Sequence, residues 1–280
     1  MDGTLGAGGH AASLLAESEP GGRLLGLDLD PQALDLARQT LAPFGERACL
    51  KLASYASLPE RLAELGWETV DGILLDLGAS SMQFDTPPRG FSFLADGPLD
   101  MRFSPSNPLT ADQIVNTWPE AELAEVIFRY GEERAAPRIS RAICRARPIA
   151  GTRQLAAVIE KATGRHGRHH PATQTFQALR IAVNGELEAL EKALPLAIQA
   201  LVSGGRLAVI SFHSLEDRRV KEYFRQESKD CICPPDQPVC TCGHKASVKE
   251  ITRRPIRPGE QETSLNPRAR SAKLRVAEKL

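Results

Sequence analysis

Residues 71–78 read DGILLDLG, and residues 204–212 read GGRLAVISF. Each is a short, nearly continuous apolar run, which is typical of a parallel strand buried on both faces of a sheet. Two further strands are expected at 23–30 (RLLGLDLD) and 48–54 (ACLKLAS), and helical patterns occur at 10–18 and from Pro31 onward. Strands that alternate with helices in this way predict a doubly wound α/β sheet.

The long segment between these strands has a different character. Residues 84–171 carry no strand signal. Thr110 and Gln113 form a capping-box pattern, and Pro119 and Pro137 each precede a helical repeat of apolar residues. We therefore expect a small helical domain, residues 84–171, inserted into a sheet domain made of residues 1–83 and 172–280.

The overall charge hides an uneven distribution. The chain has 280 residues, 35 basic and 35 acidic side chains and 42% hydrophobic residues, which excludes a disordered protein and a globally cationic coat protein. Residues 134–180 nevertheless carry ten Lys or Arg against one acidic residue, and residues 243–280 carry ten against four. Solvated helix faces and local contact with a polyanion both fit such a pattern.

The sequence also bears on location. It contains no apolar run of about 18 residues, so we expect no membrane-spanning helix. The first residues, MDGTLGAGGH, lack the basic and apolar regions of a signal peptide. These features predict a cytoplasmic protein that does not contact a membrane.

A glycine-rich motif opens the first expected helix. It reads Gly6-Ala-Gly8-Gly9-His10, and Asp28 follows about 20 residues later at the end of a strand. Glycines let a backbone approach a ligand closely, and a carboxylate in this place can accept hydrogen bonds from both hydroxyls of a ribose. The motif thus predicts a cofactor that contains adenosine, and it fits both NAD and S-adenosylmethionine.

Polar side chains also follow the later strands. Asp76, Ser80 and Ser81 come after the strand at 71–78 and could orient an exocyclic amine, although an Asp in this place can also cap a turn. His213 follows the last strand and is a candidate base or a structural hydrogen-bonding residue. The chain has no G-x-S-x-G elbow, which argues against a Ser-His-Asp hydrolase.

Several arginines are candidates for phosphate contacts. Arg138, Arg141 and Arg145 are spaced to share one helix face, and the remaining candidates are Arg165, Arg168, Arg180, Arg268 and Arg270. The adjacent His169 and His170 lack the helical spacing or nearby carboxylates of a metal site, so we assign no metal there.

Four of the six cysteines form a C-x-C-x6-C-x-C pattern, namely Cys231, Cys233, Cys240 and Cys242. The spacing is tighter than that of most zinc sites. A zinc site, a redox-active pair and four unligated thiols all remain open, and no metal is assigned to the functional site.

Taken together, several long blocks carry a family resemblance. LLDLGASSMQFD, YGEERAAPRISRAI, HPATQTFQALRIAVNGEL, GGRLAVISFHSLEDRRVK and NPRARSAKLRVAE, together with the N-terminal MDGTLGAGGH, closely resemble the bacterial 16S ribosomal RNA cytosine-N4 methyltransferases, the RsmH or MraW family. The resemblance runs from residue 1 to about residue 276. It implies a class I S-adenosylmethionine-dependent methyltransferase with a Rossmann-like sheet, which methylates N4 of one cytidine in the decoding centre of 16S rRNA.

The resemblance also implies roles for individual residues. The cofactor-binding positions correspond to Gly8, Gly9, His10, Asp28, Tyr55, Asp76 and Gln83. The catalytic candidates are Asp76 and Ser80, which would orient the target amine, and His213, which would line its pocket. Tyr55 stands where other members often have Phe, and either ring can pack against adenine. The implied partner is 16S rRNA within the small ribosomal subunit, and a homodimer remains possible.

One departure from the family concerns the first strand. Family members carry further residues before the glycine motif, including the first strand, whereas this sequence begins at the end of that strand. A truncated central strand would expose the edges of its neighbours. We therefore expect the chain as written to be less stable or less active than an extended form.

Two other functions also fit part of the pattern. An NAD-dependent oxidoreductase is compatible with the glycine motif and Asp28. A non-catalytic RNA-binding or ribosome-assembly protein is compatible with the basic segments. Cofactor binding would distinguish the first from a methyltransferase, and analysis of the modified cytidine would distinguish the second.

Overall fold

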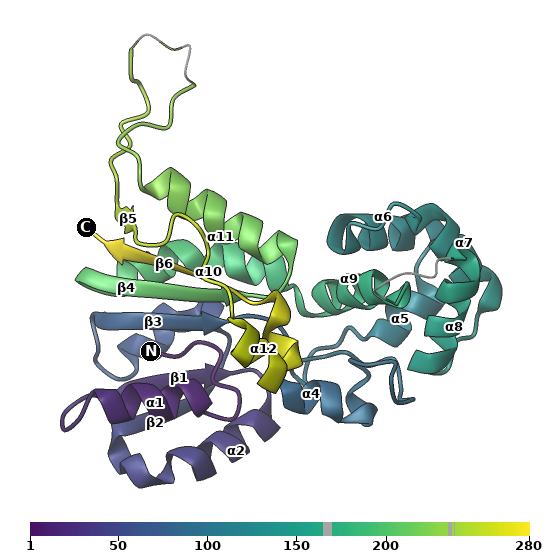
Figure 1. Ribbon diagram of the computed structural model, residues 1–280, viewed down its shortest axis with the longest axis horizontal. Coiled ribbons are helices and arrows are strands. Elements are labelled where there is room, and N and C mark those ends of the chain that lie inside the picture. Colours follow the sequence, from purple (N-terminus) through teal and green to yellow (C-terminus); the bar gives the residue numbers. More distant parts are fainter. Residues whose placement is uncertain (165–169, 235–236, 238) are drawn as a thin grey trace. The chain divides into compact units, whose positions relative to one another are not determined.

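The computed structural model describes residues 1–164, 170–234, 237 and 239–280. The chain divides into two compact units. Met1–Gly78 and Leu187–Leu280 form the first, which we call the sheet unit, and Ala79–Glu186 form the second, the helical unit (Figure 1).

The sheet unit is built on strands of both directions. Its strands are β1 (Leu24–Asp28), β2 (Ala48–Leu52), β3 (Val70–Asp76), β4 (Leu201–Ser211), β5 (Val248–Glu250) and β6 (Lys273–Lys279). β1 pairs with β2 and β3 pairs with β4, both in parallel, while β6 runs antiparallel to β4 and β5. The predicted parallel α/β core is confirmed, with an antiparallel edge added to it.

The first residues of the chain join the two parallel pairs. Asp2 forms parallel bridges to Gly26 of β1 and to Leu74 of β3. The Asp2 N–H donates to the Leu25 carbonyl at 2.9 Å, and the Leu74 N–H donates to the Met1 carbonyl at 2.9 Å. Residues 1–3 therefore occupy the position between β1 and β3, which gives the order β2-β1-(1–3)-β3-β4-β6-β5.

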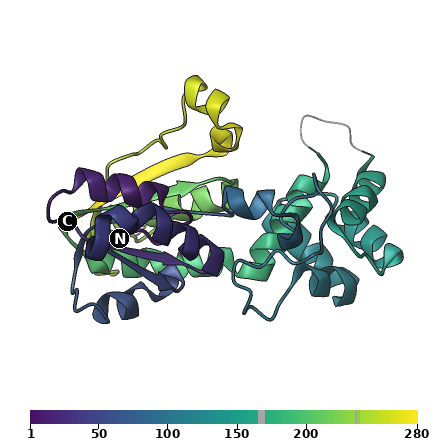
Figure 2. The ribbon, with the colours of Figure 1, turned by 90° about the horizontal axis from the view of Figure 1, so that it is seen from below.

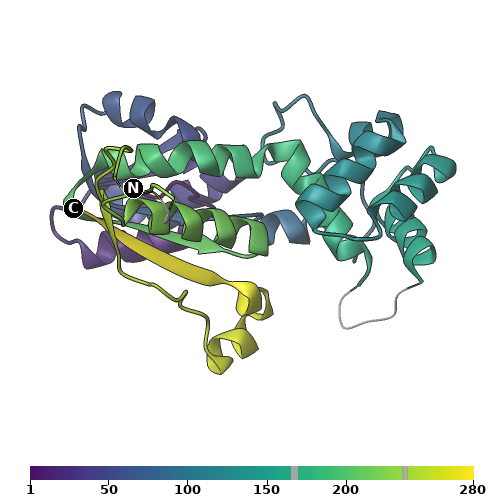
Figure 3. The same cartoon turned by 90° about the horizontal axis from the view of Figure 1, so that it is seen from above.

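Helices cover both faces of this sheet. They are α1 (Gly9–Glu17), α2 (Pro31–Leu41), α3 (Leu58–Ala63), α10 (Glu186–Ala200) and α11 (Ser214–Glu227). Leu25 and Leu27 belong to a core cluster with residues of α3, α10 and α11, whereas Leu24 clusters with residues of α1 and α2. Because neighbouring strand residues face opposite ways, the two clusters lie on opposite faces of β1. Figure 3 shows α10 and α11 side by side, and Arg219 Nε lies 2.6 Å from Glu191 Oε1 between them.

The C-terminal segment contains elements that the sequence pattern did not reveal. β6, yellow in Figure 2, follows the short helices α12 (Glu260–Leu265) and η4 (Pro267–Ser271). It lies between β4 and β5 in the sheet. Its alternation is hard to recognise because charged residues occupy several of its positions, and one of them, Arg275, is only 4% exposed.

The helical unit consists of α4 (Ser81–Asp85), η3 (Pro87–Arg89), α5 (Ala111–Thr117), α6 (Glu120–Gly131), α7 (Ala136–Ala146), α8 (Thr152–Thr163) and α9 (Ala172–Asn184). The capping box of Thr110 and Gln113 is present as expected. This unit begins at Ala79, before the predicted boundary at 84, and ends at Glu186, after the predicted boundary at 171, so it also contains α9. Phe176, Leu179 and Val183 of α9 pack in its core, which a boundary drawn from missing strand signals could not show.

Among the described residues, no helix combines the length and apolar character needed to cross a membrane.

Candidate functional site

The predicted site residues of the sheet unit gather at one edge. Asp28 ends β1 and Asp76 ends β3. Asp76 is in register with Ile210 of β4, and His213 follows that strand closely. Parallel strands present their carboxyl ends at the same edge, which is where ligands bind in open α/β sheets.

The glycine loop ends at this edge with an open helix terminus. Gly8 has φ of 86°, in the left-handed region that favours glycine, and it directly precedes α1. A Cβ at Gly8 would lie 3.3 Å from Leu41 Cγ, whereas one at Gly9 would meet nothing within 4 Å. None of the side chains that the structure describes caps α1, so its first N–H groups are available to a ligand.

The carboxylate of Asp28 accepts hydrogen bonds from the glycine loop and from the turn that follows β1. The Gly6 N–H donates to Asp28 Oδ2 at 2.8 Å, and the Asp30 N–H donates to Oδ1 at 2.8 Å. Burial raises the pKa of the Asp28 carboxyl, and these backbone hydrogen bonds act against that rise. The Leu29 backbone also hydrogen-bonds to this carboxylate, which has about four acceptor sites, so capacity remains to accept from a ribose hydroxyl.

Asp76 faces His10 from the end of the neighbouring strand. His10 Nε2 lies 3.4 Å from Asp76 Oδ2, and this interaction raises the pKa of His10. The Asp76 N–H donates to Thr4 Oγ1 at 2.6 Å, which fixes the backbone of this position. Asp76 Oδ1 is buried and has no hydrogen-bond partner among the residues that the structure describes. A buried acceptor without a donor is costly, so this oxygen indicates the place of a ligand group.

Two residues near this edge did not stand out in the sequence. Asp2 is 1% exposed, and burial raises the pKa of its carboxyl to about 6. His10 and Asp76 both act electrostatically on Asp2, which places the three groups together. Thr4 holds Asp76 from the same segment. The only available signal was their position immediately before the glycine motif.

Tyr55 follows β2, where a short 3-10 helix, η2 (Tyr55–Ser57), begins. It is partly buried against the core of the sheet unit. A Cβ on Gly3 would lie 2.9 Å from Tyr55 Cβ, so the glycine is needed for this close approach. The predicted contact of the ring with adenine stays a prediction.

Ser80 and Gln83 lie in the helical unit and cap α4 together. The Gln83 N–H donates to Ser80 Oγ at 3.3 Å, and the Ser80 N–H donates to Gln83 Oε1 at 3.0 Å. Gln83 is 5% exposed. The structure thus gives both residues a local role, and their predicted contacts with cofactor and amine remain predictions.

His213 caps α11 and is largely enclosed. Its Nδ1 accepts the Glu216 N–H at 3.4 Å, and its Nε2 lies 3.1 Å from Glu216 Oε1. Its side chain is 8% exposed. The cap accounts for Nδ1, whereas the buried Nε2 makes no hydrogen bond to the described residues. The predicted role of His213 in the target pocket stays a prediction.

The predicted arginines divide into two groups. Arg138, Arg141 and Arg145 are exposed along α7, and Arg268 and Arg270 are exposed on η4. Arg180 is a correction, because its guanidinium binds Glu186 through contacts of 2.8 and 2.9 Å and is only 12% exposed. An arginine already paired in this way is a poor phosphate ligand. Arg165 and Arg168 lie outside the described residues.

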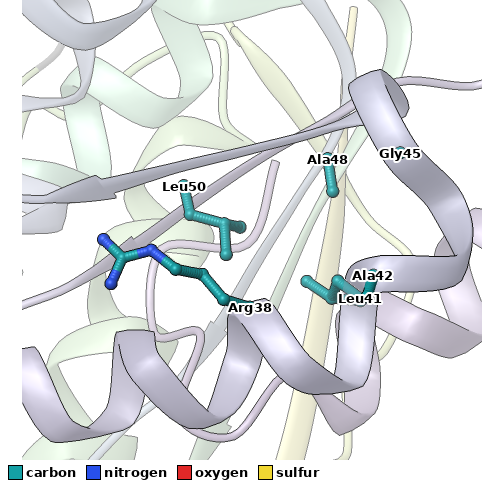
Figure 4. Close-up of a pocket in the computed structure, with 6 residues that line it drawn as sticks. All are labelled: Arg38, Leu41, Ala42, Gly45, Ala48 and Leu50. Atoms are coloured by element: carbon teal, nitrogen blue, oxygen red, sulfur yellow. The ribbon is translucent and has the colours of Figure 1, made fainter.

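Two hollows lie away from this edge. One of about 240 Å³ is lined by residues of α2 and by Ala48 and Leu50 of β2 (Figure 4). A second of about 720 Å³ is lined by Met1, Trp67 and residues around the starts of β1 and β3. Both are at or near strand beginnings, so neither coincides with the carboxyl edge that carries Asp28 and Asp76.

Comparisons with known proteins show what the chain as a whole is similar to. A model of the MraW methylase family matches residues 1–280. A ribosomal RNA small subunit methyltransferase H of Dehalococcoides mccartyi is 55% identical over 281 residues, covering 100% of this chain and 80% of the relative. Its counterpart in Heliobacterium mobile is 51% identical over 287 residues, covering 100% of this chain and 92% of the relative.

A solved rRNA methylase from Streptococcus thermophilus is also similar over 100% of this chain and 84% of its own length. Its TM-score is 0.42 and its identity 15%, so this likeness adds nothing to the assignment. The family match over the whole chain and the relatives above 50% identity are sufficient by themselves to assign the family. On this evidence, the chain belongs to the MraW methylase family.

Proposed function

We propose that the chain transfers a methyl group from S-adenosylmethionine to N4 of one cytidine in the decoding centre of small-subunit ribosomal RNA. The names of the similar proteins support rRNA as the substrate. The observation that carries the proposal is the buried Oδ1 of Asp76, which has no partner in the described part of the chain and lies beside His10 at the ligand-binding edge of the sheet.

The residues at this edge suit the proposed methyl donor. S-adenosylmethionine supplies an activated methyl group on a sulfonium. Asp28 would accept hydrogen bonds from the ribose hydroxyls, and the open N–H groups at Gly9 and His10 would bind the amino-acid portion. Tyr55 would pack near adenine, and Gln83 would complete the cofactor contacts. Membership of a methylase family favours this donor over NAD, which the glycine motif alone also fitted.

Asp76 would also act on the target amine. The N4 amine of cytosine is a weak nucleophile, so catalysis depends on orientation and on removal of a proton. The Oδ1 of Asp76 would accept one N–H of the amine and turn its lone pair toward the methyl group. As the N–C bond forms and the sulfonium S–C bond breaks to leave a thioether, this carboxylate oxygen would take up the proton that the nitrogen loses. His10 Nε2, 3.4 Å from Oδ2, would hold the carboxylate in this orientation. In this proposal Ser80 supplies a second acceptor, and His213 shapes the pocket wall.

The target base must leave its stack to reach such a site. Arg138, Arg141 and Arg145 of α7 are exposed and would contact rRNA phosphates, as would Arg268 and Arg270 of η4. Arg165 and Arg168 are proposed for the same surface.

Replacing Asp76 tests this proposal. Asp76→Asn keeps the shape of the side chain but removes its charge and its second acceptor. We expect methylation of small subunits, measured with tritiated S-adenosylmethionine, to fall at least about 100-fold, the range typical of lost acid–base catalysis. Binding of rRNA, measured separately, should not change.

Asp71→Asn is the matched control, because Asp71 is an exposed aspartate at the other end of the same strand. It should methylate normally. Near-normal methylation by Asp76→Asn would refute the role of Asp76. Calorimetric binding of NAD without binding of S-adenosylmethionine would refute the proposed cofactor.

A further inference from the structure

The loop between α11 and β5 carries the four cysteines of the two C-x-C pairs and leads away from both elements (Figure 1). Its base is closed by hydrogen bonds. The Ser247 N–H donates to the Glu227 carbonyl at 2.9 Å, and Ser247 Oγ donates to Glu227 Oε2 at 2.8 Å. Beyond this base, the described residues of the connection form no helix or strand, and a long connection of this kind has little to stabilise it. The cysteines are therefore in a segment that needs another source of order.

The four sulfurs converge, although the two pairs are separated in sequence. The Sγ atoms of Cys231, Cys233, Cys240 and Cys242 all lie within 4.8 Å of one another. Cys231 Sγ is 3.5 Å from Cys240 Sγ and 3.8 Å from Cys242 Sγ, and the last two are 3.6 Å apart. All four are free thiols, so no covalent bond accounts for the cluster.

These separations are informative about what the cluster can hold. A tetrahedral ion with zinc–sulfur bonds of about 2.3 Å has sulfur–sulfur edges of about 3.8 Å. The separations among Cys231, Cys240 and Cys242, 3.5–3.8 Å, agree with these edges, and Cys233 Sγ lies within 4.8 Å of all three. A disulfide instead requires two sulfurs at about 2.05 Å. The arrangement is closer to four ligands around one centre than to two bonded pairs.

Backbone donors support the same interpretation. The Ile232 N–H points to Cys242 Sγ at 3.5 Å, and the Cys233 N–H points to Cys231 Sγ at 3.4 Å. Hydrogen bonds of this kind stabilise the negative charge on metal-bound thiolates and orient the ligands.

We propose that Cys231, Cys233, Cys240 and Cys242 bind one Zn²⁺ ion as four thiolates. Four protein ligands fill a tetrahedral site and leave no position for substrate, so the ion is structural. It joins the two halves of the loop and fixes its path between α11 and β5. The site is separate from the carboxyl edge that carries Asp28 and Asp76, so it does not rest on the proposed methyl transfer.

Metal content measured on the reduced full-length chain tests the proposal. The protein is loaded with zinc chloride, freed of excess metal and analysed by mass spectrometry of the elements. We expect one zinc ion per chain in the wild type and none in a Cys231→Ser/Cys242→Ser variant. Replacement of zinc by Co²⁺ should give thiolate-to-cobalt charge transfer and the strong visible bands of a tetrahedral site.

The two remaining cysteines provide the control, because Cys49 lies in β2 and Cys144 in α7. Cys49→Ser and Cys144→Ser should each retain one zinc ion per chain. Circular dichroism of the cluster variant should show the helix content of the wild type, so that its loss of zinc reports ligand removal. Three results would overturn the proposal: no zinc in the loaded wild type, iron in its place, or equal zinc in the cluster variant.

Discussion

At the scale of single residues, Asp2 is a carboxylic acid that lies buried in the protein. Its Oδ1 accepts the Thr4 N–H at 3.1 Å, while its Oδ2 is buried with no hydrogen-bond partner among the described residues. Loss of hydration disfavours the charged carboxylate and raises its pKa from 3.8 to about 6. The folded protein therefore holds this proton more tightly than the unfolded chain does.

The raised pKa of Asp2 gives a pH dependence with a definite sign. Between pH 4 and pH 6 the folded state binds more of this proton, so the contribution of Asp2 to the free energy of unfolding falls as pH rises. The shift corresponds to about 3 kcal/mol. Relative to the wild type, Asp2→Asn should therefore be less stable at pH 4 and should lose little or no stability at pH 8. Urea unfolding at both values measures this difference.

The exposed Asp71 of β3 again provides a control, because Asp71→Asn removes an aspartate from the surface and not from the interior. The comparison between variants is needed because Asp28 and His10 also have raised pKa values, while those of Asp100 and Asp217 are lowered. If wild type and Asp2→Asn show parallel pH profiles, the carboxyl of Asp2 titrates normally in the folded protein.

Asp28 and Asp76 were predictable from sequence, because each is a carboxylate that directly ends an apolar strand. Asp2 was not, since its burial depends on residues 1–3 lying between β1 and β3. The ion-pair partner of Arg180 was also not predictable from the sequence. Glu186 lies beyond the end of α9, and only the turn at Gly185 brings its carboxylate to the guanidinium.

At the scale of whole elements, the start of α1 depends on a glycine. Gly8 has φ of 86°, which an L-residue adopts at a cost of about 1–2 kcal/mol. The Cβ of an alanine there would also press on Leu41. We expect Gly8→Ala to lower the free energy of unfolding by about this amount, as measured in urea.

Gly9→Ala is the control for this prediction. Gly9 is the first residue of α1, and a Cβ there would meet no atom within 4 Å. Alanine favours a helix more than glycine does, so this variant should be as stable as the wild type or more so. Equal stability of the two variants would show that the backbone at Gly8 is not strained.

The elements also show where a pattern of residues stops being informative. Helix α2 was predictable because Asp30 caps its N-terminus and Pro31 suits its first position. Strand β6 was not, because its buried Arg275 looks like a surface residue in the sequence. Its guanidinium is paired with Asp217 at 2.7 Å, and no local pattern connects residues so far apart.

At the scale of the whole molecule, a net charge of zero coexists with two basic segments. The structure shows that counting arginines overstates the surface charge of those segments. Arg180 and Arg275 are largely buried in ion pairs with Glu186 and Asp217, whereas Arg141 and Arg145 are exposed. The charge available to a polyanion is therefore a subset of what the sequence contains.

If α7 contacts rRNA, its exposed arginines should govern the salt dependence of binding. Each phosphate contact to a single strand contributes a slope of about 0.7 in log affinity against log salt concentration. Arg141→Glu/Arg145→Glu should thus weaken binding to a 16S rRNA fragment and reduce the slope by about 1.4. Filter binding at several salt concentrations measures both quantities.

Arg38→Glu/Arg206→Glu changes the total charge by the same amount, at two exposed arginines of the sheet unit. If net charge alone decided the affinity, the two double variants would weaken binding equally. A larger loss and a smaller slope for the α7 variant only would locate the RNA on that helix. Equal behaviour would mean that the basic face of α7 is merely solvated, and the RNA surface would then have to involve other basic residues.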